Sequence, residues 1–297
     1  MWRLIAGGVL LALLAMMPSG CTLEPALGTE GHPIVWVFLP SNDADRLLDH
    51  AQRLAALLRD VSGMVIKPIV APNYREGVQA LCAGKAHMGV LDPFSYIVAH
   101  RQKCVTAALT PVRWGSTFHA SQITVSRKSG IRSIVELKGK TFCRSDPLSA
   151  SGWVILLILM RKEGLDPGRD LAQVGDVGTP LGVIQSVYSG LHDAGATYVD
   201  AREQLAGKLP DVTHRVLVIS ASPPIPNEAI AFAKKVPEEI QEKTIQTLLN
   251  VMNDKKKRSL IEDIYSWEGL VRIRDPYYDA FRKTLSTAGI ETKDLIR

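Results

Sequence analysis

The sequence predicts an α/β protein built from two blocks in which strands and helices alternate. Continuous apolar runs, such as residues 34–39 before Pro40, are typical of strands buried on both faces of a sheet. Between such runs, leucine and alanine recur at helical spacing, as in residues 47–58. The alternation indicates a mostly parallel sheet flanked by helices in each block. With 297 residues, 46% of them hydrophobic, the chain is long enough for one large or two mid-sized domains.

In the first block the apolar runs are expected to be strands, and the segments between them helices. Ser41 or Asn42 can cap the first helix, and Gly84 closes the second. The expected strands are residues 34–39, 64–70, 88–91, 105–112 and 121–126, and the second and third helices are residues 74–82 and 94–101.

The second block restarts the alternation and shares a detail with the first. In each block a helix ends at a glycine, Gly84 or Gly190, and a second glycine, Gly89 or Gly195, enters a strand five positions later. This is a modest indication of two similar lobes. The expected elements are strands at residues 139–143, 172–177 and 193–198, and helices at residues 149–163 and 181–188.

Beyond residue 211 the chain is expected to return to the first block. A strand at residues 214–219 precedes the proline-rich segment 222–226, a stiff connector suited to a crossing between lobes. An extended segment at residues 228–233 follows, and the remainder is expected to be helical, at residues 237–252, 255–267 and 275–288. This section most simply packs on the first block, which makes the first lobe discontinuous.

The N-terminus predicts export and a lipid anchor. A short basic start with Arg3 precedes the apolar residues 4–17, a run too short to span a bilayer. Small residues before Cys21 resemble a bacterial lipobox, although Pro18 departs from the usual aliphatic residue and leaves ordinary cleavage as an alternative. We therefore expect a signal peptide at residues 1–20, lipidation of Cys21, and a flexible tether at residues 21–33. The mature chain is expected to be an extracytoplasmic, lipid-anchored monomer.

The charge of the chain argues against nucleic acid as a partner. The formal net charge is +5, and it becomes +4 once Arg3 leaves with the signal peptide. This charge is small and evenly spread. The one basic run, residues 255–258, lies between acidic helices and is interpreted as a solvated helix end.

Three cysteines remain besides Cys21, and an odd number in an oxidising compartment implies one pair and one free thiol. Cys82 and Cys104 end successive helical segments and are the favoured disulfide, with Cys143 buried in a strand; other pairings stay open. A three-thiolate metal or metalloid site ranks below the disulfide, because the spacings contain no C-x-x-C.

The start of the second block's first helix has the composition of an anion site. Ser149 or Ser151 can cap this helix, and the positions after Ser149 carry no Asp or Glu against the positive end of the helix dipole. Its first-turn N–H groups and two hydroxyls can therefore receive an external oxyanion. The alternative is that water or a neighbouring carboxylate satisfies these donors.

Six motifs in order resemble the substrate-binding lipoproteins of phosphate, phosphite and phosphonate ABC importers. The resemblance extends from about Val35 to the last helix. The motifs are Asn73-Tyr74 opening a helix, Asp92-Pro93-Phe94-Ser95-Tyr96, Ser121-Gln122-Ile123-Thr124-Val125, Leu137-Lys138-Gly139-Lys140-Thr141-Phe142, Asp146-Pro147-Leu148-Ser149-Ala150-Ser151-Gly152 and Asp193-Ala194-Gly195-Ala196-Thr197.

The resemblance implies a two-lobed type II periplasmic binding protein fold with two hinge crossings. Lobe 1 would contain residues 34–120 and 223–297, and lobe 2 residues 121–222. A small oxyanion would be enclosed between the lobes and delivered to an ABC permease. The ligand-binding residues that it implies are Tyr74, Tyr96, Ser121, Gln122, Ser149, Ala150, Ser151 and Thr179.

Two departures from the family pattern concern the ligand. Ala150 replaces a threonine of the usual Ser-Thr-Ser-Gly, and Thr179-Pro180 replaces Ser-His, which removes a histidine that commonly approaches the ligand. His87 also stands where the family often has Asp. With fewer donors, we expect a smaller or less charged oxyanion than the tight phosphonate binders take.

Two other functions are alternatives to import. A ligand-presenting sensor protein for a membrane histidine kinase keeps the fold, and a free thiol at Cys104 or Cys143 would then suit a metalloid oxyanion. An enzyme acting on a small phosphorylated substrate is disfavoured, because the sequence lacks a G-x-S-x-G elbow and the nearby histidine. No H-E-x-x-H or similar spacing is present, so neither a metal nor a cofactor is expected.

Overall fold

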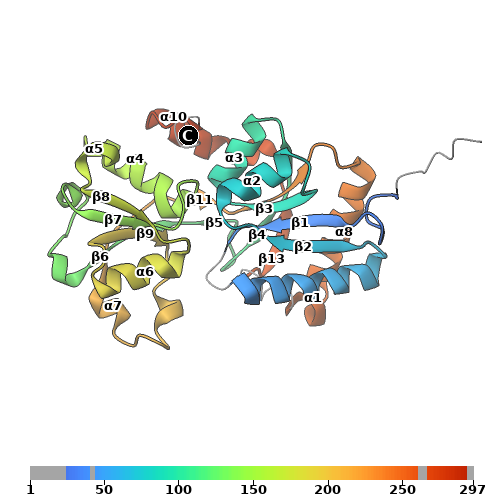
Figure 1. Ribbon diagram of the computed structural model, residues 1–297, viewed down its shortest axis with the longest axis horizontal. Helices are drawn as coiled ribbons and strands as arrows, with labels where there is room; N and C mark the ends of the chain where they lie inside the picture. The colour runs from blue at the N-terminus through green and yellow to red at the C-terminus, as the bar shows by residue number, and fades with distance from the viewer. Residues whose placement is uncertain (1–24, 41–43, 260–265, 293–297) are drawn as a thin grey trace, which may run out of the picture.

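The computed structural model of the chain describes residues 25–40, 44–259 and 266–292, and it contains two α/β lobes side by side (Figure 1). A six-stranded sheet forms the centre of lobe 1, and a five-stranded sheet forms the centre of lobe 2. Helices cover the sheets in both lobes (Figure 1). The predicted signal peptide and the lipidation site Cys21 lie outside the described residues.

Lobe 1 is built from the N-terminal part of the chain and from segments that return after lobe 2. Its sheet has the order β13-β4-β12-β3-β1-β2, with β2 and β3 parallel to β1, and β12 and β13 antiparallel to their neighbours. The strands are β1 (Ile34–Phe38), β2 (Ile66–Val70), β3 (Met88–Leu91), β4 (Val105–Val112), β12 (Ala229–Ala233) and β13 (Gly269–Arg272), and the long helices are α1 (Ala44–Ser62), α2 (Tyr74–Cys82), α3 (Pro93–Arg101) and α8 (Glu238–Asn253).

Lobe 2 contains the sheet β10-β6-β9-β7-β8, in which β7 is parallel to β8 and β9 while β6 is antiparallel to β9 and β10. Its strands are β6 (Ser121–Ser126), β7 (Thr141–Arg144), β8 (Gln173–Asp176), β9 (Ala194–Tyr198) and β10 (Val216–Ala221). Its helices are η3 (Ala150–Val154), which continues into α4 (Ile155–Lys162), then α5 (Pro167–Asp170), α6 (Pro180–Ser189) and α7 (Val212–Arg215).

Two antiparallel crossing strands join the lobes. β5 (Phe118–His119) leads into lobe 2, β11 (Ile225–Pro226) leads back, and they pair as a two-stranded sheet between the lobes (Figure 1). Asn227 fixes this crossing, since its Nδ2 donates to the Pro111 and Ser116 carbonyls at 2.9 and 3.1 Å.

The C-terminal segment reaches from lobe 1 to lobe 2. It contains η5 (Asp275–Tyr278) and α10 (Asp279–Thr287), which lies above α3 and beside α4 in Figure 1. Arg161 at the end of α4 donates to the carbonyls of Ala288 and Gly289 at 2.9 and 2.6 Å. This contact is a third link between the lobes, besides the two crossing strands.

The paired glycines of the two blocks have a structural reason. Gly84 and Gly190 end helices with φ of +71° and +79°, a conformation that favours glycine. A Cβ on Gly89 would lie 2.9 Å from Leu81 of α2, and one on Gly195 would overlap Val183 of α6. In each lobe the second glycine therefore lets a helix pack closely on the sheet.

The two-lobed α/β fold is as predicted, with three local differences. Both sheets are mixed, because strands that return after a crossing run antiparallel to their neighbours. β13 occupies residues 269–272, which were expected to link two helices, because its pairing partner β4 is distant in sequence. Helix α7 occupies the start of the expected strand at 214–219, because Val212 packs into the lobe 2 core there. In the described part of the chain, no helix combines the length and the apolar character that crossing a bilayer requires.

Candidate ligand-binding cleft

The candidate site lies where the two lobes face each other, beyond the ends of β3 and β7. Asp92 follows β3 directly, and Ser145 and Asp146 follow β7. In open α/β sheets, ligands bind at the carboxyl ends of the strands. The start of α3 in lobe 1 contacts η3 in lobe 2, so these two edges meet.

The helix formed by η3 and α4 begins at this boundary. Ser149 is its N-cap, and the Ser149 Oγ accepts a hydrogen bond from the Gly152 N–H at 3.0 Å. None of the first-turn residues is acidic, and the first turn has the wider π-helical geometry, which often occurs at functional sites. The positive end of the helix dipole therefore points at lobe 1.

A carboxylate of lobe 1 lies at this helix start. The Ala150 N–H donates to both oxygens of Asp92, at 3.0 and 3.1 Å, and Phe94 N–H donates to the same carboxylate at 3.0 Å. Burial raises the pKa of Asp92 to about 8, against the lowering effect of these hydrogen bonds, and the carboxylates of Glu228 and Asp146 raise it further. A neighbouring carboxyl group thus accepts a donor of the helix start, which is the alternative that the sequence left open. The sequence did not indicate that Asp92 would be this group.

A second carboxylate makes the reverse contact. Asp146 of lobe 2 accepts a hydrogen bond from the N–H of Tyr74, the first residue of α2 in lobe 1, at 3.1 Å. It also accepts the Leu148 N–H at 2.7 Å. Burial and, to a smaller extent, the carboxylate of Asp176 raise the pKa of Asp146, while its hydrogen bonds and the nearby Arg144 act in the opposite direction. Each lobe thus caps a helix of the other.

A groove of about 410 Å³ opens between the lobes beside these contacts. The Ser145 Oγ at its wall is fully buried and, among the residues the structure describes, has no hydrogen-bond partner. It lies against Gly152, where even a Cβ atom would overlap it. The groove is lined from lobe 1 by Pro40, Pro72, Asn73 and Arg75, and from lobe 2 by Ser145, Asp146, Pro147, Leu148, Asp176 and Gly178.

Three other predicted ligand residues support the walls of the cleft. The Ser121 Oγ donates to the Ser151 carbonyl at 2.7 Å, which ties the hinge to the helix start. Gln122 is buried and donates to Thr197 Oγ1 at 3.4 Å. Thr179 caps α6, since its Oγ1 accepts the Gly182 N–H at 3.0 Å. These hydroxyl and amide groups position backbone around the groove.

The two predicted tyrosines lie in different places. Tyr74 begins α2 next to the groove-lining Asn73. The Tyr96 hydroxyl instead donates to Asp275 Oδ1 at 2.8 Å, in a cluster with Arg282 on the C-terminal segment. The Tyr96 hydroxyl therefore has a partner on the C-terminal segment, and its contact with a ligand stays a prediction. Sequence order could not reveal this, since Asp275 lies 179 positions later.

The cysteines are placed away from any ligand chemistry. Cys82 and Cys104 form a disulfide, and Cys143 is free and buried in β7. Burial raises the pKa of the Cys143 thiol to about 12, so the thiol is not ionised at neutral pH. Among the described residues, histidine, cysteine and acidic side chains nowhere gather in groups of three or more that could ligate a metal ion.

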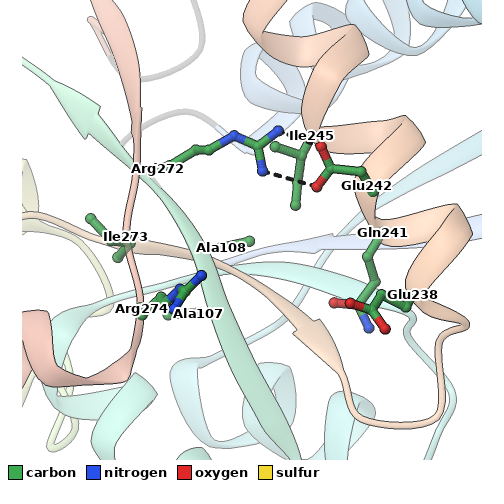
Figure 2. Close-up of a pocket in the computed structure, with 9 residues that line it drawn as sticks. All are labelled: Ala107, Ala108, Glu238, Gln241, Glu242, Ile245, Arg272, Ile273 and Arg274. Atoms are coloured by element: carbon green, nitrogen blue, oxygen red, sulfur yellow. Dashed lines mark hydrogen bonds and ion pairs between the residues drawn. The ribbon is translucent and has the colours of Figure 1, made fainter.

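A larger hollow, of about 680 Å³, lies outside the cleft. Figure 2 shows it between α8 and the strands β4 and β13, with Arg272 and Glu242 paired across it at 2.9 Å. All of its lining residues belong to lobe 1. It therefore has no contact with the boundary at which a two-lobed protein encloses a ligand.

Two α/β lobes, joined by paired crossing strands and bordering a groove lined from both sides, define the class of periplasmic substrate-binding proteins. Residues 36–278 match the family described as ABC transporter, phosphonate, periplasmic substrate-binding protein, and the chain belongs to this family. Its members are the binding components of transport systems and not enzymes. The family, the fold and the non-enzymatic character expected from the sequence are thereby confirmed.

Individual relatives are distant. The Phosphate-import protein PhnD of Mycolicibacterium smegmatis is 22% identical over 200 residues, which cover 65% of this chain but only 60% of that relative. A binding protein component of an ABC phosphonate transporter from Pseudomonas aeruginosa superimposes with a TM-score of 0.79 at 17% identity, with 89% of each chain covered. PhnD1 from Prochlorococcus marinus, in complex with methylphosphonate, gives a TM-score of 0.75 at 16% identity, covering 86% of this chain and 98% of that one. At these identities, the two structures are similar in fold alone.

Proposed function

We propose that this protein captures a small oxyanion of the phosphate, phosphite or phosphonate class between its lobes and delivers it to an ABC importer. The observation that carries the proposal is the start of η3, where the positive end of a helix dipole lies against the Ser145 Oγ, beside the groove between the lobes. The names of the relatives agree with this ligand class.

Neutral donors suit this task. Ser151 Oγ and the buried Ser145 Oγ can donate to a dehydrated oxyanion, and the first-turn N–H groups of η3 add the field of the helix. Ser149 and Ser121 would act indirectly. Ser149 holds the Gly152 N–H in place, and Ser121 holds the Ser151 carbonyl. Tyr74 would approach from lobe 1, on the opposite side of the groove. Closure of the lobes about β5 and β11 would then present the form that the permease recognises.

The remaining parts of the proposal concern location and partners. Cys21 would carry a lipid after removal of residues 1–20, and residues 21–33 would tether a monomer to the outer face of a membrane. The permease would dock on the lobes of the closed form. A sensor role with a histidine kinase would use the same cleft, but the disulfide and the buried Cys143 give no support to a metalloid ligand.

The test is a thermal-shift screen followed by calorimetric titration of the purified protein. Phosphate, phosphite, methylphosphonate, sulfate and arsenite are compared, and at least one phosphorus oxyanion is expected to stabilise the protein. Ser151→Ala should weaken its binding about tenfold, the loss of a hydrogen bond to a charged group. Ser189→Ala, at the exposed end of α6, is the matched control and should bind normally. A screen in which no anion raises the melting temperature would refute the proposal.

A further inference from the structure

The carboxyl group of Asp92 lies where an oxyanion would meet the helix start. Both of its oxygens receive the Ala150 N–H, the first of the η3 donors, across the boundary between the lobes. A ligand oxygen that approaches this helix start must therefore share the Ala150 N–H with Asp92 or lie beside the Asp92 carboxyl group. Two ionised groups at such a distance, inside a buried site, repel each other strongly.

Among the described residues, the charged side chains that act most strongly on Asp92 are acidic and do not relieve this repulsion. The charged groups that face it are the carboxylates of Glu228 and Asp146, and Tyr278 is the further titratable group on the packed η5 segment. The neighbouring cation Arg113 pairs with Glu228 at 2.8 Å. A negative ligand next to an ionised Asp92 would thus add a charge to a region that is already acidic.

An independent observation points to a ligand at this place. The Ser145 Oγ is buried and lacks a hydrogen-bond partner among the described residues, while it lies against Gly152 of the same helix turn and lines the groove. A buried hydroxyl without a partner is costly, and an oxygen of a bound oxyanion would satisfy it.

We propose that Asp92 couples ligand binding to a proton: an oxyanion occupies this helix start together with one proton, held between a ligand oxygen and the Asp92 carboxyl group. This inference rests on the proposed function and adds a specificity-determining residue to that site. The proton comes from Asp92 itself when the carboxyl group is protonated, from the ligand when it carries a P–OH group, and from solvent when both are ionised. In each case the ligand and Asp92 together carry one negative charge less than they would if both were fully ionised.

The proposal has a quantitative consequence at alkaline pH. Where both Asp92 and the ligand are ionised, formation of the complex takes up one proton, so the affinity falls about tenfold for each pH unit. Asp92→Asn removes the charge and keeps a carbonyl oxygen that can accept the Phe94 and Ala150 N–H groups, since Asp92 Oδ1 receives both. The variant should therefore bind the same ligand without proton uptake.

The experiment is calorimetric titration of the purified protein with methylphosphonate at pH ~9, in two buffers that differ in ionisation enthalpy. Wild type should take up about one proton per ligand bound, and Asp92→Asn about none. The affinity of wild type should fall about tenfold from pH ~8.5 to pH ~9.5, while that of the variant changes little. Asp170→Asn is the matched control, because it removes a buried carboxylate that does not line the groove and should leave the proton uptake in place.

The outcomes separate this inference from the proposed function. Tight binding of methylphosphonate with the same proton uptake by wild type and Asp92→Asn would overturn the role of Asp92 and leave the binding function intact. Proton release by wild type would also overturn it, because it would mean that the ligand displaces Asp92 into solvent. Failure of both proteins to bind any oxyanion would refute the proposed function and this inference together.

Discussion

Asp92 and Asp146 make reciprocal contacts between the lobes, and their surroundings differ. Each follows a strand, precedes a proline, and accepts the N–H of the first residue of a helix in the other lobe. Asp146 lies at the groove, near the cation Arg144. Asp92 is as little exposed as Asp146, at 8%, and it faces the acids Glu228 and Asp146. Similar contacts thus produce two kinds of carboxyl group, a partly compensated one at the mouth of the cleft and one that holds a proton at neutral pH.

The two carboxyl groups should differ most in how they affect the pH dependence of the free energy of unfolding. The pKa of Asp92 in the folded protein, about 8, lies above its ordinary value of 3.8, so the folded state retains a proton that the unfolded state releases between these pH values. The contribution of Asp92 to the free energy of unfolding therefore falls as pH rises through this window. Asp92→Asn should remove this decline and gain stability relative to wild type, on the order of 2–5 kcal/mol above pH ~8.

Chemical denaturation from pH ~4 to pH ~9 measures this difference directly. Asp146→Asn is the comparison, and its gain should have the same sign and be smaller, because its hydrogen bonds and Arg144 offset more of the burial. Equal curves for the two variants would show that the environments do not differ in the way described.

The second effect concerns the two helix starts that these carboxylates cap. Gly152 in η3 has no room for a side chain, since a Cβ would overlap Ser145 Oγ and lie 2.9 Å from Ser149 Oγ. Gly152→Ala should cost about 1–3 kcal/mol of stability and abolish oxyanion binding. Gly77→Ala in α2 meets only the Leu39 methyl group at 2.6 Å and the Ala71 Cβ at 3.4 Å. It should be close to neutral, because a small shift of Leu39 is offset by about 0.5–1 kcal/mol of helix preference.

Thermal unfolding and a methylphosphonate titration of both glycine variants test this contrast. If Gly152→Ala retained the affinity of wild type, the helix start of lobe 2 would not be the ligand site.

Much of the fold follows from local sequence signals. The strand at residues 88–91 and the helix at 74–82 have the predicted limits, because apolar runs, caps and glycines mark them directly. Ser149 proved to be the cap of η3, as one of two candidates. β13 was missed because a four-residue strand has little pattern of its own, and its pairing with β4 depends on contacts between distant parts of the chain.

The site was predicted less completely than the fold. The absence of acidic residues after Ser149 indicated that the donors of the helix start have no local acidic partner. It could not reveal that the carboxyl group of Asp92, 58 positions before Ala150, accepts the first of these N–H groups. A signal was available, since Asp92 and Asp146 both follow strands of the predicted parallel type, and the carboxyl ends of such strands meet in a cleft. The direction of the Tyr96 hydroxyl depended on the C-terminal segment and had no local signal.

The smallest effect concerns the tyrosines on the lobe 1 side. Tyr96→Phe removes the hydrogen bond to Asp275 and should cost about 1 kcal/mol of stability, the usual value for such a bond. It should leave the affinity for oxyanions unchanged, because the hydroxyl already donates to Asp275. Denaturation and calorimetry of this variant measure both quantities. A loss of affinity of tenfold or more would place Tyr96 in the ligand site after all.

The most direct test of the central claim is an NMR titration of the isotope-labelled protein with methylphosphonate, followed at the backbone amides. The account predicts that the largest shifts occur at Ala150, Ser151 and Gly152, at the start of η3, with smaller ones across the cleft at Tyr74. Shifts confined to the hollow around Arg272 and Glu242, or no shifts at saturating ligand, would contradict it.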